Sequence, residues 1–207
     1  ITDGVANTVI GKSAGDAMTS ADYNTFIGYY AGSTTVDADK CVAIGGQAME
    51  AGNATDAADG TVAIGWNTLR SLTTGVGNVS VGFESMYTLV NGDDNVAIGK
   101  QALYSNAGAA GNDNNIAIGT SALYTAGAST NVATANVAIG TNALKLNQTG
   151  DSNVCVGVSS GDALTAANSC VAIGTSAIGA VATQDGTVAV GHQALTALTS
   201  GAYNTAI

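Results

Sequence analysis

A regularly spaced Ile-Gly or Val-Gly pair organises this sequence. The pair recurs eleven times, and the position numbers of successive glycines differ by 17, 17, 20, 17, 17, 20, 21, 17, 17 and 17. A fixed period overrides local secondary-structure preferences, because each repeat is one unit stacked on its neighbours. We therefore expect one repeat domain over residues 1–207 with about twelve coils, and we interpret it as a segment of a longer repeat array. The glycines are Gly11, Gly28, Gly45, Gly65, Gly82, Gly99, Gly119, Gly140, Gly157, Gly174 and Gly191.

The residues before each glycine predict a short strand. The third residue before it is Val, Ile or Thr, and the residue directly before it is Ile or Val. These two positions share one face of a strand, and β-branched side chains favour strands over helices. In "NVAIGKQALYS", residues 95–105, we expect a strand, a turn at Gly99 and a return strand in the same coil. A helical return is the alternative, although the period is shorter than that of helix-containing repeats of this kind.

Between these two positions lies a column of small residues, mostly alanine. A strand face in contact with water normally carries varied polar residues. The restriction to alanine indicates a close neighbour, and another copy of the chain is the simplest one. The sequence thus predicts a homo-oligomer with this column at the interface: Ala43, Ala63, Ala97, Ala117, Ala138, Cys155, Ala172 and Ala189.

Two polar columns precede the strand. Asn stands four residues before the glycine in eight of twelve repeats, and Asp stands six before it in seven. This spacing is typical of turns, and stacked Asn side chains can also bond one another along the stack. The Asp column allows a bound cation or a solvated turn, and we favour the turn. The longer repeats place their extra residues in "EAGNATDAAD", "SNAGAAGNDN" and "TAGASTNVATA", which we expect to be loops that leave the stack unbroken.

The units "NVAIGKQAL", "NIAIGTSAL" and "NVAIGTNAL" resemble the head repeats of trimeric autotransporter adhesins and the similar repeats of phage tail-fibre proteins. The resemblance covers essentially the whole chain. It implies an all-β solenoid, namely a left-handed parallel β-roll, with three parallel chains in a homotrimer that attaches to a host surface. Adhesin head repeats are usually shorter than the period found here, so the choice between the two families stays open.

An enzyme is the weaker interpretation. Ile-Gly-x-x-Ala-Leu resembles one hexapeptide of left-handed β-helix acyltransferases, but only one hexapeptide in each repeat fits. Their catalytic histidine has no counterpart here, because His192 occupies a variable position just after a glycine. No set of nucleophile, base and orienting group can be assembled, so we expect no catalytic residues.

We also expect no metal and no cofactor. Cys41, Cys155 and Cys170 lack the spacing of a zinc site and are interpreted as small buried residues. A formal net charge of −10 with five basic residues argues against nucleic-acid binding. The sequence contains no run of 18 apolar residues, so we predict no membrane span.

Aromatic residues gather in two columns. Tyr87, Tyr104 and Tyr124 stand five residues after the glycine in three consecutive repeats, and Trp66 and Phe83 stand one residue after it in two. They form either a packing ladder or trimer contact, or a strip on which a surface glycan stacks. Two main functions remain, both extracellular on a cell surface or a virion. One is an adhesive fibre segment that binds a host glycan or protein, and the other is a purely mechanical spacer.

Overall fold

The structure of the protein is a computed structural model. It describes residues 4–51, 54, 58–104, 112–125, 133–180, 185–198 and 200–207.

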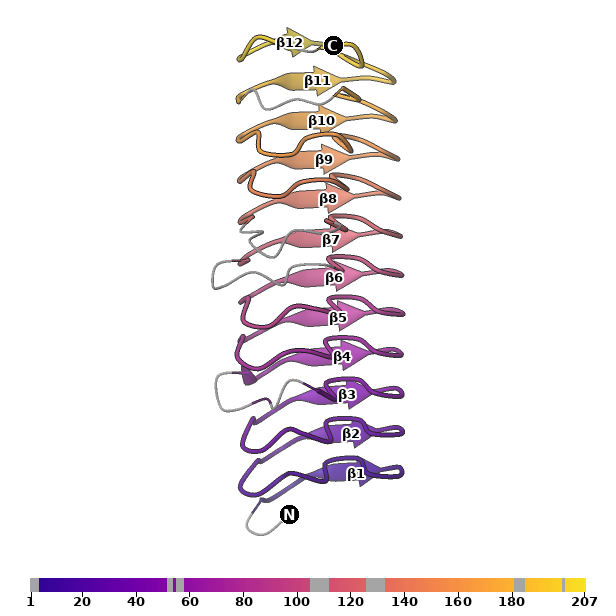
Figure 1. Cartoon of the computed structure of the whole chain (residues 1–207), viewed down its shortest axis with the longest axis vertical. Coiled ribbons are helices and arrows are strands. Elements are labelled where there is room, and N and C mark those ends of the chain that lie inside the picture. The colour runs from indigo at the N-terminus through magenta and orange to yellow at the C-terminus, as the bar shows by residue number, and fades with distance from the viewer. Residues whose placement is uncertain are drawn as a thin grey trace.

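Twelve short strands form one parallel sheet in which every strand pairs with the next one along the chain. Figure 1 shows them stacked from the N-terminal end at the bottom to the C-terminal end at the top. The strands are β1 (Thr8–Ile10), β2 (Thr25–Ile27), β3 (Val42–Ile44), β4 (Val62–Ile64), β5 (Val79–Val81), β6 (Val96–Ile98), β7 (Ile116–Ile118), β8 (Val137–Ile139), β9 (Val154–Val156), β10 (Val171–Ile173), β11 (Val188–Val190) and β12 (Thr205–Ala206). The predicted β-solenoid is confirmed, and the described residues contain no α-helix.

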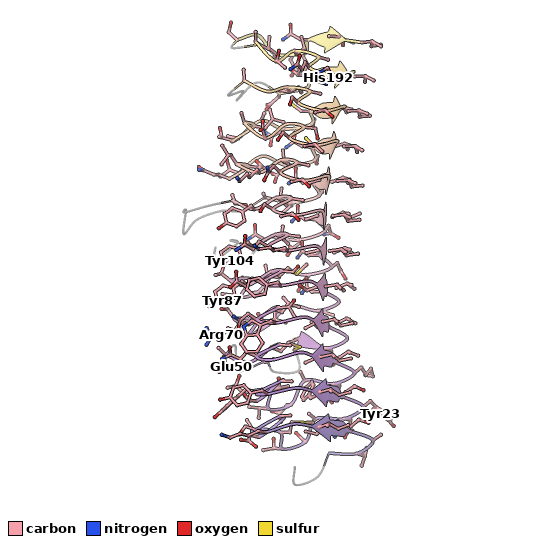
Figure 2. All side chains as sticks on the ribbon, turned by 90° about the vertical axis from the view of Figure 1, so that its right-hand side faces the viewer. Tyr23, Glu50, Arg70, Tyr87, Tyr104 and His192 are labelled. Carbon is pink, nitrogen blue, oxygen red and sulfur yellow. The ribbon has the colours of Figure 1, made fainter. Side chains whose placement is uncertain are left out.

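The coil is left-handed. In Figure 1 the strands run from left to right as the chain rises. Figure 2 views the molecule from the right-hand side of Figure 1 and shows that the strands lie on the side away from the viewer of Figure 1. The chain therefore turns clockwise when it is viewed from the C-terminal end and advances toward that viewer. This handedness agrees with the one that the resemblance implies.

The longer repeats leave the stack unbroken, as predicted. The strands on either side of each insertion pair in the same register as the others, with Val42 opposite Val62 and Ile116 opposite Val137. Most of the inserted stretches, residues 52–53, 55–57, 105–111 and 126–132, lie outside the described residues. Extra residues are therefore accommodated without a shift of register.

The prediction of a return strand is wrong. Each described coil has one strand, and the return segment is a series of turns. Gln101 and Leu103 adopt φ angles of 56° and 49°, which are incompatible with an extended chain. Their backbone N–H groups nevertheless bond to neighbouring coils: Gln101 donates to Phe83 O (2.9 Å) and Leu103 to Ala122 O (3.0 Å). A left-handed leucine costs roughly 1–2 kcal/mol, which burial of its side chain offsets at about 1.5–3 kcal/mol.

The alanine column points into the coil, against the sequence-based prediction of an interface. Ala43, Ala63, Ala97, Ala117, Ala138, Cys155, Ala172 and Ala189 have no exposed surface within a single chain. They pack against the chain's own return segment, whose buried side chains include Leu69, Leu103 and Leu144. The interior is only one strand and one return segment deep, so a small side chain fits wherever the return segment supplies a large one. These eight side chains therefore cannot contact a second copy.

The repeated glycine is required by close stacking. Gly140 has a φ of 131°, and a Cβ on it would lie 2.5 Å from the carbonyl oxygen of Gly157 in the next coil. The same contact recurs from Gly11 to Gly174. Any other residue would push neighbouring coils apart, which explains the strict column.

The asparagine column forms the predicted ladder, but in the interior. The Oδ1 of Asn95 accepts the backbone N–H of Asn115 (3.0 Å) and its side-chain amide (3.1 Å). The Asn95 side-chain amide in turn donates to Asn78 Oδ1 (3.1 Å) and to the carbonyl oxygen of Asn112 (2.6 Å). The same bonds join Asn136 to Asn115 and Asn153 to Asn136. Each buried amide is thereby satisfied by the coil above and the coil below.

Candidate functional site

The most extensive exposed feature is the outer face of the sheet. The middle residue of each strand points inward, so its two neighbours point outward, and several of these are well exposed, including Ile64, Ile98, Ile139 and Ile173. Val or Ile occupies the first outward position in nine of twelve repeats and the second in all twelve, and the other three residues are Thr. We call this surface, formed by the outward residues of β1–β12, the Val/Ile face.

No charged side chain interrupts the Val/Ile face from the first repeat to the last. Parallel sheets in proteins are normally covered on both faces, and exposed apolar patches of this extent mark interaction sites. The sequence contained this signal, because two β-branched residues alternate with one alanine. Alternation by itself does not say which of the two sets lies inside.

A second feature lies on the opposite side of the molecule, where Tyr87 and Tyr104 follow Arg70 and Glu50 along the stack (Figure 2). The rings of Tyr87 and Tyr104 stack with centroids 5.4 Å apart and an interplanar angle of 8°. Tyr104 and Tyr124 stack at 5.0 Å and 13°. We call Glu50, Arg70, Tyr87, Tyr104 and Tyr124 the tyrosine ladder.

Arg70 and Glu50 extend the ladder toward the N-terminus, and sequence reasoning missed them. Arg70 Nε donates to Glu50 Oε2 (2.7 Å), which is the one ion pair of the described residues. The same guanidinium donates to the hydroxyl of Tyr87 (3.0 Å) and lies 5.9 Å from its ring centroid. All five residues occupy the position five after the glycine, so the shared column was a signal that could have revealed them.

The ladder leaves ring edges rather than ring faces for a ligand. Tyr104 has Tyr87 on one face and Tyr124 on the other, and the guanidinium of Arg70 lies over the ring of Tyr87. Burial raises the pKa of Tyr104, and the charge of Glu84 acts in the same direction. A sugar that stacks on ring faces therefore has little open area on this ladder, whereas the row of hydroxyl groups can form hydrogen bonds.

The five aromatic residues predicted to contact a glycan lie on two different surfaces. Trp66 and Phe83 belong to the column one residue after the glycine, at the edge of the Val/Ile face, and are 48% and 46% exposed. His192, from the same column, lies on the strand side in Figure 2, whereas Tyr87 and Tyr104 lie on the other side. The three tyrosines do form the expected continuous strip over three coils. Trp66 and Phe83 do not extend it, because columns four residues apart fall on opposite sides of the turn, and contact with a glycan stays a prediction.

The remaining candidate residues are His192 and the three cysteines. His192 is exposed, as predicted. Cys41, Cys155 and Cys170 are buried and form no disulfide, and burial raises the pKa of Cys41 to about 11 and that of Cys155 to about 12. Within the described residues there is neither a pocket nor a group of three His, Cys, Asp or Glu side chains able to hold a metal ion.

The aspartate column consists of turn residues that also join coils. Asp39 Oδ1 accepts the backbone N–H of Asp22 (2.6 Å), and Asp59 Oδ1 accepts that of Asp39 (2.8 Å). Asp113 accepts the backbone N–H of Asp93 in the same way (2.9 Å). These bonds give each carboxylate a structural partner one coil below.

No family model matches the chain, and no curated protein or solved structure shows significant similarity to it. Among the residues that the structure describes, none belongs to a helix able to cross a membrane.

Proposed function

We propose that this chain is a non-catalytic fibre segment that assembles as a parallel homotrimer through its Val/Ile face. Its place is outside the cell, in the head of a surface adhesin or in the shaft of a phage tail fibre. There it mediates or supports attachment to a host surface. The repeat units that resemble both kinds of protein support this assignment, and so does the solenoid fold.

The observation that carries the proposal is the uninterrupted Val/Ile face. Ile98 is 41% exposed in the single chain, and Ile173 is exposed to the same extent. Covering an Ile or Val side chain stabilises the assembly by about 25 cal/mol for each Å² of apolar surface removed from water, and this contribution repeats in every coil. A flat surface that repeats at the strand spacing is covered best by an identical surface with the same spacing, so the favoured partner is another copy.

The fold also suits a rigid fibre. Each coil bonds only to the coils above and below, and twelve coils at about 4.8 Å per strand extend over roughly 55 Å. The net charge of −10 favours solubility of a long exposed structure. The tyrosine ladder lies opposite the Val/Ile face, so it stays accessible in such an assembly and is the first surface to test for adhesion.

The assembly is tested by the mass of the protein in solution. Light scattering should give three times the chain mass of 20.1 kDa. Ile98→Lys places a charge on the Val/Ile face of each copy and should yield folded monomers, because three unpaired ammonium groups cannot be buried together. Leu146→Lys is the matched control, since Leu146 is 43% exposed but lies outside the strands. A wild-type monomer would contradict the proposal.

Adhesion and a purely mechanical role are separated by a binding assay. The trimeric wild type and the triple variant Tyr87→Ala, Tyr104→Ala, Tyr124→Ala are compared on host-surface glycans, after their mass has been checked. Loss of binding in a trimeric variant supports an adhesive ladder. Equal binding of both proteins removes the ladder as the adhesive surface, and an absence of binding by the wild type favours the spacer.

A further inference from the structure

Two exposed columns flank the Val/Ile face. One lies five residues before the repeated glycine, at the start of the strand, and we call it the leading edge. The other lies one residue after the glycine, beyond the strand, and we call it the trailing edge. Tyr23 of the leading edge and His192 of the trailing edge both lie on the strand side in Figure 2. Residues at these edges therefore border any surface that covers the Val/Ile face.

The two edges are complementary in four coils. The leading edge has glycine in three coils, and in each of them the trailing edge carries a bulky ring. The leading edge has a carboxylate in one coil, and there the trailing edge carries a lysine. The pairs are Gly60 with Trp66, Gly77 with Phe83, Gly186 with His192, and Asp94 with Lys100.

Paired residues cannot meet within one chain. They stand six positions apart, and the five residues between them include the extended strand, so their backbones lie about 20 Å apart if the whole segment is extended. A lysine side chain reaches about a third of that distance. In the described structure Asp94 and Lys100 form no ion pair with each other, and the Lys100 ammonium lies 5.9 Å from the ring centroid of Phe83.

Packing inside the chain explains only part of the pattern. A Cβ on Gly77 would lie 2.6 Å from the Asp94 carboxylate one coil above, and a Cβ on Gly186 would lie 2.5 Å from the Tyr203 ring. All three glycines also have a φ near 70°, which favours glycine. Gly60, however, would meet nothing within 4 Å. Neither cause acts across the strand, so neither links a glycine to the ring at the far edge of the same coil.

We propose that the leading edge of one copy meets the trailing edge of the next copy in the same coil. This inference rests on the proposed homotrimer and specifies its arrangement. A rotation axis parallel to the long axis of the solenoid places equal coils at equal heights and brings unlike edges together. Antiparallel copies would instead bring like edges together. In the assembly Trp66 covers Gly60 of the partner subunit, and Lys100 forms an ion pair with Asp94 of the partner subunit.

A zero-length carbodiimide tests the ion pair in the wild-type protein. The reagent first bonds to a carboxylate, and a lysine amine then displaces the reagent to form an amide. The amide forms only between groups already in contact. We expect covalent trimers on a denaturing gel and a linked peptide that joins residue 94 to residue 100. Asp94→Asn and Lys100→Gln should each remove that linked peptide while light scattering still shows trimers.

Exchange of the two charges by mutation tests the same ion pair without a cross-linking reagent. Asp94→Lys and Lys100→Asp each place like charges together and should raise the dissociation constant of the assembly by about threefold to tenfold. The double variant restores the pair with reversed polarity and should return to within about twofold of the wild type. Thr120→Asp, in the trailing edge of the next coil opposite the uncharged Asn114, is the control and should not be rescued by Asp94→Lys.

The outcomes separate this inference from the proposed function. A trimer without the 94–100 link and without rescue by charge exchange overturns the edge pairing and leaves the fibre assignment standing. Efficient disulfide cross-linking through position 94 between copies of the Asp94→Cys variant shows like edges in contact and overturns the parallel arrangement. A covalent dimer as the end product keeps the pairing but overturns threefold symmetry, and a monomeric wild type overturns both proposals.

Discussion

The ring of Phe26 fills the space in which a side chain on Gly32 would stand. A Cβ built on Gly32 would lie 2.6 Å from two carbon atoms of that ring. Cys155 and Gly161 have the same relationship, with 2.5 Å between such a Cβ and the sulfur. In most other complete coils the middle residue of the strand is alanine or serine, and the residue four after the repeated glycine is Leu, Met or Ile. The first coil differs, with Val9 in the strand and Gly15 opposite it. One interior volume is thus filled from either side of the coil.

This relationship predicts a rescue. Phe26→Ala should lower the free energy of unfolding by about 3–5 kcal/mol, because it leaves a cavity. Gly32→Leu should also destabilise, because its side chain meets the Phe26 ring. The double variant reproduces the alanine and leucine of neighbouring coils and should recover most of the loss in urea denaturation. Additive losses would contradict shared filling of one volume.

The buried asparagine ladder predicts a large effect for one amide. Asn95→Ala removes a side chain that bonds to three other residues and leaves the Asn115 backbone N–H without its acceptor. Unsatisfied buried groups cost about 1–3 kcal/mol each, so we expect a loss of about 3 kcal/mol in urea denaturation. Asn114→Ala is the control, because Asn114 is exposed and alanine occupies the same column at Ala135; since the left-handed φ of 60° favours Asn over Ala, its effect should reach about 1 kcal/mol at most.

Stacking in the tyrosine ladder is also measurable. Tyr104→Ala removes two stacked ring pairs, each worth about 0.5–1.5 kcal/mol beyond burial, and should destabilise by about 2 kcal/mol. The control is Tyr203→Ala, since that ring is 80% exposed. A thermal unfolding curve that moves equally for both variants would show that the ladder contributes nothing to stability.

The three thiols should be unreactive until the chain unfolds. Burial is the main cause of the raised pKa of Cys41, Cys155 and Cys170. A thiol reagent at pH 8 should therefore modify no cysteine in the folded protein and all three in denaturant. Rapid modification of the native protein would place at least one thiol at the surface.

The same pKa shift predicts how stability depends on pH. The folded pKa of Cys155 lies at about 12, above the ordinary value of 9.0, so the neutral thiol is favoured in the folded state. Its contribution is complete below about pH 9 and is lost as the pH rises toward 12, because the unfolded chain ionises first. Cys155→Ala should reduce the decline of unfolding free energy over that interval, and an unchanged slope would contradict the assignment.

The sequence by itself determined the repeat, the strand positions, the parallel register and the asparagine ladder. Equal spacing places each residue beside its equivalent in the next coil, so any column of one residue type must tolerate contact with itself. Strand, turn and ladder follow from that condition together with local preferences. The Val42 to Val62 pairing across an insertion shows that the columns determine register even where the spacing changes.

Only the tertiary structure decided which strand face lies inside and which columns share a surface. Alternation shows that the residues flanking an alanine share a face, but not whether that face points inward. The narrow interior decided this, because it has room for Ala97 opposite Leu103 but none for a row of isoleucines. The left-handed turns then carried Trp66 to the Val/Ile side and Tyr104 to the opposite side, although both follow the glycine by a few residues. The interior volume and the turn geometry are properties of the closed coil, so they cannot be read from any single column of the sequence.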